Sequence, residues 1–512
     1  MALTLKRLLL LLSFPVVLMA LPSPLPLEEF RTQYRRSDPE DRRCDLVARL
    51  GAARDPEAAE PLSRLLEKER SYPCLQCFIV RALCEEGSPA ALESVLGVLR
   101  EHGARLDPCV PLFTRRALGS VQNPKGLAWM TTRAWKDVPE LREDILWALA
   151  RNTAWKDPAF FLDHLPERRE KDPRLRAAAA EGLRRLAAPV TAEAVLLSAQ
   201  IEPSPAVLMR LLPAAGRLLP ERALPLLERM SRHPDLRARL GAIEGLAASA
   251  AASGAQKIVQ EQSLSLLVQI LARENGRLRA DAARCLEALT GKAFGTDAPE
   301  WRTYLQERGT ALPAGFQEVG TKAPKHLGVE MPSRRIVFLV EVSQEMVENR
   351  LTRQRSERLD KAKKELLKRI DELPPDADFA VVAFGPAVQR WREGISAGTP
   401  EARASARAWV KQLAGHGPPD LGAGLQAAWD MGGGEGQADT VVLVASGQPM
   451  ERGATTLFAG ELRYPFALLD WISLQGRSRS VVLHTVGVGN AADKKVLKSL
   501  AEATGGTYRA ID

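Results

Sequence analysis

Helix-forming sequence fills residues 37–309 almost without interruption, and its breaks are regularly spaced. Apolar residues recur there at intervals of three and four, and Ala and Leu dominate. Three breaks join a helix-capping residue to proline, at intervals of 33 and 35 residues: Asp55-Pro56, Ser88-Pro89 and Asn123-Pro124. A capping side chain followed by proline starts a helix, because the cap satisfies a free amide and proline suits the first helical position. Residues 37–309 are therefore predicted to form a series of short helices.

The spacing of these breaks indicates a repeat of two helices. The tripeptide Leu-Arg-Ala adds a second signal at 175–177, 236–238 and 278–280, although its intervals of 61 and 42 residues are irregular. A helix pair of this length buries its apolar face only against its neighbours, which is typical of an α-solenoid. The Asp-Pro-x-x-Arg-x-x-Ala starts resemble HEAT repeats over residues 37–309. Armadillo-like or other helical repeats would give a similar pattern.

Residues 333–512 have a different character. Short apolar runs at 335–342, 378–384, 441–444 and 481–488 are typical of buried parallel strands. Amphipathic stretches separate or follow them at 358–373, 400–413, 421–431, 457–474 and 491–503. Alternating strands and helices predict an α/β doubly wound, Rossmann-like sheet, whose ligands bind at the carboxyl ends of the strands.

Three segments of this region carry a family resemblance. The first is Ile336-Val-Phe-Leu-Val-Glu-Val-Ser-Gln-Glu-Met346, and it resembles the first strand and metal loop of the von Willebrand factor A (vWA) domain. The second, Arg358-Leu-Asp-Lys-Ala-Lys-Lys-Glu-Leu366 with Phe379-Ala-Val-Val-Ala-Phe384, is similar to that domain's first helix and second strand. The third, which resembles the last part of the domain, is His484-Thr-Val-Gly-Val-Gly489 with the following Leu500-Ala-Glu-Ala-Thr-Gly-Gly-Thr-Tyr508. The resemblance extends over residues 333–512 and implies a non-enzymatic interaction module. His484, inside a strand, is interpreted as a packed core residue.

The same resemblance locates a candidate binding site. In the family, an Asp, two Ser, a Thr and a second Asp hold a divalent cation in a metal-ion-dependent adhesion site. Those positions correspond here to Glu341, Ser343, Glu345, Pro419 and Ser446, so only Ser343 keeps the family's residue type. The site is therefore predicted to be degenerate, with no bound metal and no catalytic residue.

Two alternatives remain open for these loops. Glu341, Glu345 and the neighbouring Asp420 could form a remodelled Ca²⁺ site, because Ca²⁺ tolerates irregular oxygen ligands. They could also be ordinary solvated loop carboxylates. The candidate binding residues are Glu341, Ser343, Glu345, Asp420 and Ser446.

The N-terminus predicts export. Lys6 and Arg7 precede an apolar run over 8–20, which is followed by a proline-rich stretch over 21–27. A run this short suits a signal peptide over residues 1–20 rather than a membrane span of about 20 residues. No later segment is apolar enough for a transmembrane anchor, so the protein is expected in the periplasm, the cell envelope or the extracellular space. Residues 311–332, rich in Gly, Pro and Lys, are the predicted linker.

The distribution of charge and the catalytic motifs of the sequence limit the classes of function to consider. Lys and Arg exceed Asp and Glu by 71 to 63, but the basic residues are dispersed on helix faces, which argues against nucleic-acid binding. The common phosphate, zinc and acyl-transfer motifs are absent. We therefore expect a non-enzymatic protein–protein interaction or adhesion-type scaffold without a cofactor, whose protein partners are unknown.

The alternative function is a thiol-redox or other envelope enzyme that uses Cys74 and Cys77, which have a Cys-x-x-Cys spacing. The residues around them favour a simpler interpretation. Cys77 and Cys84 are seven residues apart, on one helix face, as small core residues would be. A structural disulfide among the first repeats is a further possibility.

Overall fold

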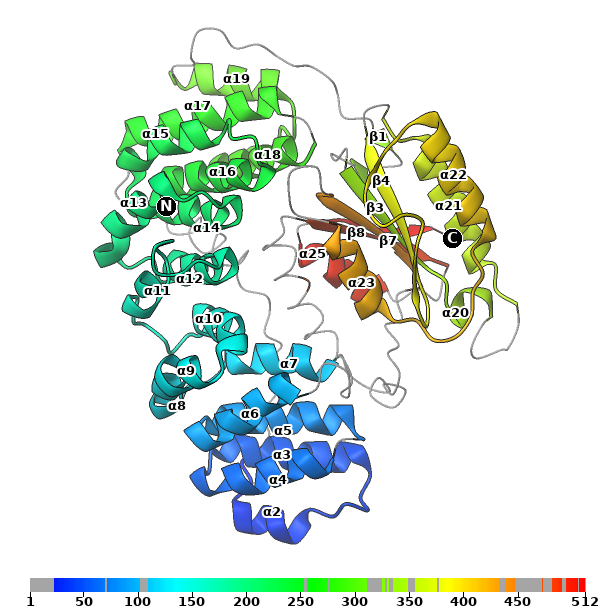
Figure 1. Cartoon of the computed structure of the whole chain (residues 1–512). Helices are drawn as coiled ribbons and strands as arrows, with labels where there is room; N and C mark the ends of the chain where they lie inside the picture. Colours follow the sequence, from blue (N-terminus) through cyan, green and yellow to red (C-terminus); the bar gives the residue numbers. More distant parts are fainter. Residues whose placement is uncertain are drawn as a thin grey trace. The chain divides into compact units, whose positions relative to one another are not determined.

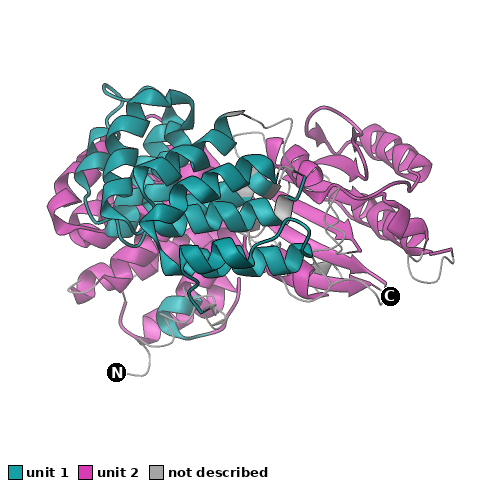
Figure 2. Ribbon diagram, turned by 90° about the horizontal axis from the view of Figure 1, so that it is seen from below, with its two compact units in different colours: residues 1–186, 287–292 teal, residues 187–286, 293–512 magenta. Residues whose placement is uncertain are grey.

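A computed structural model describes most of the chain (Figure 1). The described residues are 23–69, 71–101, 109–252, 256–274, 276–310, 325–326, 329–330, 335–348, 355–374, 377–431, 438–446, 472, 481–489, 494–504 and 506–511. The chain divides into two compact units, residues 1–186 with 287–292 and residues 187–286 with 293–512 (Figure 2). The predicted signal peptide lies outside the described residues.

The first unit is helical. Its helices are α2 (Leu27–Gln33), α3 (Glu40–Ala53), η1 (Pro56–Ala58), α4 (Ala59–Lys68), α5 (Pro73–Glu86), α6 (Pro89–Glu101), α7 (Cys109–Leu118), α8 (Pro124–Trp129), η2 (Met130–Ala134), α9 (Trp135–Asp137), η3 (Pro139–Leu141), α10 (Arg142–Arg151), α11 (Ala159–Asp163) and α12 (Pro173–Leu186). Helices two steps apart along the sequence pack together, α3 on α5, α5 on α7 and α10 on α12. A helix-rich N-terminal region is thus confirmed.

The three predicted breaks are helix starts. The Asp55 carboxylate accepts the Glu57 amide at 2.9 Å, and the Asn123 side chain accepts the Lys125 amide at 3.0 Å. Asn123 also donates from Nδ2 to the carbonyl of Glu86, at 3.1 Å, at the end of α5. One side chain therefore begins its own helix and caps an earlier one.

A second asparagine makes the same kind of connection. Asn152, which is fully buried, donates from Nδ2 to the Val121 carbonyl at 2.7 Å. Its Oδ1 accepts the amides of Ala154 and Trp155 at 2.8 and 2.9 Å. Successive helix pairs are thus joined by hydrogen bonds as well as by apolar packing.

The second unit begins with further helices. They are η4 (Pro189–Thr191), α13 (Ala192–Ile201), α14 (Pro205–Leu218), α15 (Pro220–Met230), α16 (Leu236–Ala251), α17 (Lys257–Arg273), α18 (Gly276–Thr290) and α19 (Ala298–Glu307). Helices α14 and α16 approach so closely that a Cβ on Gly216 would meet the Gly245 carbonyl oxygen at 2.2 Å. Ser249 Oγ joins them by donating to the Gly216 carbonyl at 3.1 Å.

One local arrangement occurs in both units, in segments 170–176 and 233–239. An aspartate accepts the amide two residues on, and an arginine further along donates to the carbonyls five and six residues before it. The residues are Asp172, Arg174 and Arg176 in the first unit and Asp235, Arg237 and Arg239 in the second. The two places share the pattern Asp-x-Arg-x-Arg, and the Leu-Arg-Ala tripeptides at 175–177 and 236–238 fall at different positions within it.

The second unit also contains a seven-stranded sheet. Its strands are β3 (Arg335–Glu341), β4 (Asp378–Phe384), β5 (Val388–Arg390), β6 (Ser396–Ala397), β7 (Thr440–Ala445), β8 (Val482–Val488) and β9 (Tyr508–Ile511). The order is β5-β4-β3-β7-β8-β9, with β6 beside β4. Strands β4, β3, β7, β8 and β9 are parallel, whereas β5 and β6 run antiparallel to β4.

Helices cover both faces of this sheet (Figure 1). Helices α20 (Gln344–Val347), α21 (Arg358–Asp371) and α22 (Pro400–Gln412) share one core with the sheet. Helices α23 (Leu421–Asp430) and α25 (Lys494–Glu502) share the core on the other face. The predicted α/β sheet is confirmed. The predicted helix over 457–474 lies outside the described residues, except Ile472.

Most of the predicted linker over 311–332 also lies outside them. Within it, β1 (Lys325–His326) pairs antiparallel with β2 (Val329–Glu330). No helix among the described ranges is both long and apolar enough to cross a membrane.

Candidate binding site at the strand tips

The site forms where two neighbouring parallel strands end. β3 ends at Glu341 and β7 ends at Ala445, and these strands pair in register from Ile336 with Thr440 to Val340 with Val444. The carboxyl ends of parallel strands meet at one edge, which brings Glu341 next to Ser446 although 105 residues separate them.

The Glu341 carboxylate is held by the two serines. Ser343 Oγ donates to Oε1 at 2.6 Å. The Ser446 amide donates to Oε2 at 2.8 Å, and Ser446 Oγ lies 3.1 Å from Oε1 and 2.9 Å from Oε2. A hydroxyl has one proton, so the carboxylate accepts from three donors: the Ser343 hydroxyl, the Ser446 amide and the Ser446 hydroxyl, which is shared between its two oxygens.

Burial makes this arrangement energetically important. Glu341 is 1% exposed, and both Ser343 and Ser446 are buried. Burial raises the pKa of Glu341, the hydrogen bonds from the serines lower it, and the charge of Glu345 raises it further; the net direction is upward. The alternative that Glu341 is a solvated loop carboxylate is wrong, because the group has almost no contact with water.

The other predicted residues surround this centre. Glu345, in α20, is 9% exposed, and its carbonyl accepts a hydrogen bond from Arg358 Nη1 at 3.2 Å. The loop that contains Pro419 is bound to the first residue of α20, because the Gln344 amide donates to the Gly417 carbonyl at 2.7 Å. Glu341, Ser343 and Ser446 are thus in direct contact, and Glu345 and Pro419 lie on segments bound beside them.

Asp420 has a different role from the one considered in the sequence. Its Oδ1 accepts the Ala423 amide at 2.9 Å and caps the start of α23. An aspartate at this position stabilises a helix through its first-turn amides. One carboxylate oxygen of Asp420 therefore takes part in a structural interaction, and the residue lies on the loop bound through Gly417.

Comparisons with known proteins agree with this geometry. Residues 334–510 match the family model described as von Willebrand factor type A domain. This segment is a vWA domain. The match indicates no catalytic family, and none of the curated proteins matches the protein.

Solved structures resemble the chain at low identity. They include an aerotolerance-related membrane protein from Bacteroides fragilis, at 16% identity, a TM-score of 0.27 and coverage of 35% of this chain and 92% of that chain. A von Willebrand factor type A protein from Catenulispora acidiphila shows 22% identity, a TM-score of 0.28 and coverage of 36% and 40%. Proximal thread matrix protein 1 from the mussel byssus shows 14% identity, a TM-score of 0.26 and coverage of 35% and 43%.

The side chains at these positions can be compared with the ligands that a cation requires. Mg²⁺ requires near-octahedral oxygen ligands, but Pro419 has no side-chain oxygen and the Glu341 oxygens already accept from the serines. Among the described residues, no group of three or more His, Cys, Asp or Glu side chains could hold a metal. The extra methylene of Glu341, compared with aspartate, carries its carboxylate into the space between Ser343 and Ser446.

His484, in the core of the vWA domain, is packed as the sequence analysis indicated. It is 7% exposed, and its Nδ1 accepts the Thr507 amide at 3.1 Å and lies 2.8 Å from Thr507 Oγ1. Burial lowers its pKa to about 4, so the ring is neutral at physiological pH.

The cysteines do not form a recognisable reactive centre in the described residues. Cys77, Cys84 and Cys285 form no disulfide in the part of the chain that the structure describes. Burial raises the pKa of Cys84, and raises that of Cys285 to about 12, so both are poor nucleophiles. Cys77 is half-buried on α5, and the side chain of Cys74 lies outside the described residues.

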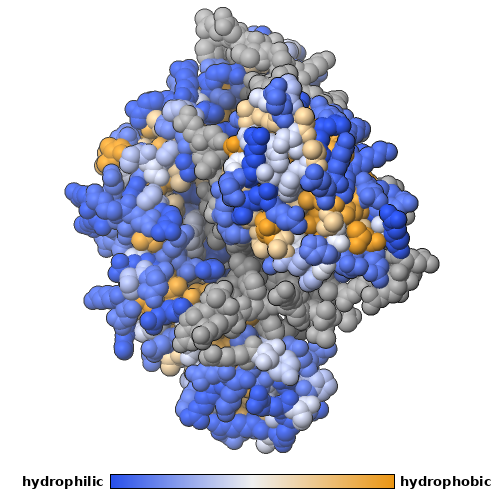
Figure 3. Space-filling view, turned by 45° about the vertical axis from the view of Figure 1, so that its right-hand side comes forward, coloured by the Kyte–Doolittle hydropathy of each residue, from blue (hydrophilic) through white to orange (hydrophobic). Residues whose placement is uncertain are grey.

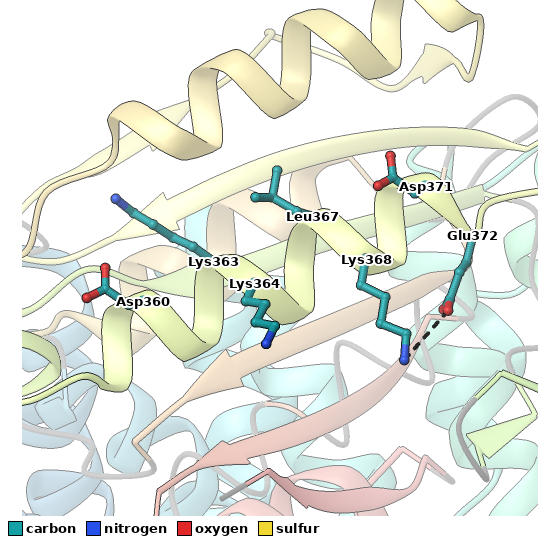
Figure 4. A pocket seen from close by; sticks show the side chains of 7 residues that line it. All are labelled: Asp360, Lys363, Lys364, Leu367, Lys368, Asp371 and Glu372. Atoms are coloured by element: carbon teal, nitrogen blue, oxygen red, sulfur yellow. Dashed lines mark ion pairs between the residues drawn. The ribbon is translucent and has the colours of Figure 1, made fainter.

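A surface hollow lies away from the strand tips. It is lined by seven residues of α21 and its end, from Asp360 to Glu372 (Figure 4). These carry charges of both signs, and Lys368 pairs with Glu372 at 3.8 Å. A lining from one helix with mixed charge is typical of a solvated helix face and indicates no ligand.

One residue at the tips escaped the sequence analysis. Arg358 begins α21, and the sequence places it in an amphipathic segment that resembles the family's first helix, with no role at the strand tips. Its contact with Glu345, thirteen residues earlier, depends on the path of the intervening loop. No spacing rule in the sequence could have shown it.

Proposed function

We propose that the protein is an exported, non-enzymatic interaction scaffold whose vWA domain binds protein partners without the usual divalent cation. The helical region, interpreted as a HEAT-like solenoid over residues 37–309, supplies a second binding surface. The predicted signal peptide over 1–20 supports export to the periplasm, the cell envelope or the extracellular space.

One observation carries the metal-free part of the proposal. The Glu341 carboxylate joins the loop after β3 to the loop after β7 through Ser343 and Ser446. An ion bound between such loops would hold them together in the same way. The internal carboxylate bridge makes this edge rigid without a cation, and a rigid surface binds partners at a lower entropic cost.

Exposed apolar residues support a binding role for the helical region. Val190, Leu197 and Ile201 are 80%, 58% and 82% exposed, on or just before α13. Leu197 and Ile201, four residues apart, lie on one side of α13, whereas Val190 lies in η4 just before it. On the face drawn in Figure 3, most of the described surface is hydrophilic, and hydrophobic residues gather in a few patches.

The test is a calorimetric titration of the full-length protein with Mg²⁺ and Ca²⁺. We expect no binding at micromolar ion concentrations. Micromolar Mg²⁺ binding that Glu341→Ala abolishes would refute the proposal, whereas Ca²⁺ binding alone would support the remodelled-site alternative.

A variant can serve as a positive control. The quadruple change Glu341→Asp, Glu345→Ser, Pro419→Thr and Ser446→Asp supplies the family's five ligands together with Ser343. It shortens the bridging side chain, adds a hydroxyl at position 419 and replaces the hydroxyl at position 446 by a carboxylate, so this variant should gain Mg²⁺ affinity. Partner capture from an envelope extract should proceed equally with and without a chelator for the natural protein.

A further inference from the structure

Arg358 has a fixed position at the strand tips. Its aliphatic stem lies against Gly489 at the end of β8, where a Cβ on that glycine would meet Arg358 Cγ and Nε at 3.4 Å. Its Nη1 donates to the Glu345 carbonyl at 3.2 Å. Arg358 thus contacts both the end of β8 and the segment after β3, which are separated in the sheet by β7.

The carboxylates near Arg358 are occupied by other donors. Glu341 accepts from the serines, and Asp420 accepts from the first turn of α23. Glu348 accepts from the side-chain amide of Gln344 at 2.6 Å, and Glu345 is buried. Among the described residues, none forms an ion pair with Arg358.

The guanidinium therefore has donors to spare. It carries five N–H groups, and the contact with Glu345 uses one of them. The side chain is half-buried and its stem is fixed, so less rotational freedom is lost when a ligand binds. The planar fork of arginine matches a carboxylate with two parallel hydrogen bonds.

We propose that Arg358 is the anchor for a carboxylate of the protein partner, either an Asp or Glu side chain or the terminal carboxylate of the partner polypeptide. This inference rests on the proposed function, because it gives the chemistry of the group that the cation-free surface recognises. The Glu341 bridge holds the surface, and Arg358 supplies its outward positive charge.

The experiment is a differential selection of random peptides displayed on phage, with the full-length protein as target and a chelator present. Peptides that bind an Arg358→Gln variant are removed first, and the remainder are selected on the natural protein. We expect the retained peptides to be enriched in Asp or Glu, and Arg358→Gln to weaken them at least tenfold. A loss of that size corresponds to one hydrogen-bonded charge pair.

Two further variants separate recognition from stability. Lys361→Gln removes an exposed charge one turn along α21 and should leave binding unchanged. Arg358→Lys keeps the charge without the fork, and should fall between the natural protein and Arg358→Gln. Synthetic copies of the peptides with free and amidated C-termini distinguish a terminal carboxylate from a side-chain one.

The outcomes are distinct. A retained pool without acidic residues, or no pool that distinguishes Arg358→Gln from the natural protein, overturns the anchor. A parallel selection without chelator tests the proposed function: peptides that need Mg²⁺ and are lost in Glu341→Ala would overturn it. Circular dichroism spectra equal to that of the natural protein are required as evidence that each variant is folded. If Arg358→Gln is unfolded, the binding of Arg358→Lys decides the result.

Discussion

His484 makes the stability of the vWA domain dependent on pH in a way that can be calculated. Its Nδ1 accepts the Thr507 amide, so a proton on Nδ1 would replace an acceptor by a donor. Burial lowers the pKa from 6.5 to about 4. At a pH between these two values, the His484 ring is protonated in the unfolded protein and neutral in the folded protein. Stability from this group is complete above pH 6.5 and is lost as the pH falls towards 4.

The size of this loss of stability follows from the difference between the pKa of His484 in the unfolded and in the folded protein. Each unit is worth about 1.4 kcal/mol, so the domain should lose about 3 kcal/mol between pH 6.5 and pH 4 from this residue. His484→Asn removes the titration and keeps a side-chain oxygen as acceptor for Thr507. The loss over this pH range should be about 3 kcal/mol smaller in the variant than in the natural protein.

Amide hydrogen exchange provides the assay. Exchange of peptides that contain β8 and β9, corrected for the intrinsic effect of pH, gives the opening free energy of the strands that His484 joins. Measurements at pH 7, 5.5 and 4.5 on both proteins isolate the histidine from the carboxylates that titrate in the same range. Parallel pH profiles would show that His484 becomes protonated without cost and refute the reasoning.

Three further predictions follow from the site and the sequence. Glu341→Ala leaves the Ser446 amide and two buried hydroxyls without their acceptor, so calorimetry should show the vWA domain destabilised by roughly 2–4 kcal/mol; an unchanged transition would contradict the bridge. Limited proteolysis should cut first within residues 311–332, and joint melting of the two sides without cleavage there would count against a linker. Mass spectrometry of the mature protein should find its N-terminus near Leu21, whereas an intact Met1 in a cytoplasmic fraction would exclude the predicted export.

The sequence predicted the buried strands closely, because each is a continuous apolar run. The run at 378–384 coincides with β4, and the other three differ from β3, β7 and β8 by one residue at one or both ends. The short strands β5, β6 and β9 were not predicted. They have only two to four residues and no apolar run, and their pairing with β4 or β8 depends on the finished sheet.

The site shows where sequence reasoning stops. The family resemblance identified Glu341, Ser343 and Ser446 as site residues. Comparing them with the family's metal ligands showed only which ligands this site lacks. The bridge depends on the reach of one glutamate across two strand ends, which is a matter of distance in the folded protein. Asp420 similarly looked like a carboxylate available for a metal, because its role as a helix cap depends on where α23 begins.

The hydrogen bonds between helix pairs affect how the first unit can be shortened. Asn123 lies just before α8 and caps the end of α5. Asn152 follows α10 and donates to the Val121 carbonyl, which lies between α7 and α8. A truncation after α7 would keep both helices of the earlier pair and still leave the Glu86 carbonyl without its partner. The end of α5 thus depends on a residue that follows α7, so a truncation at this point should loosen a helix that precedes the cut as well as remove those that follow it.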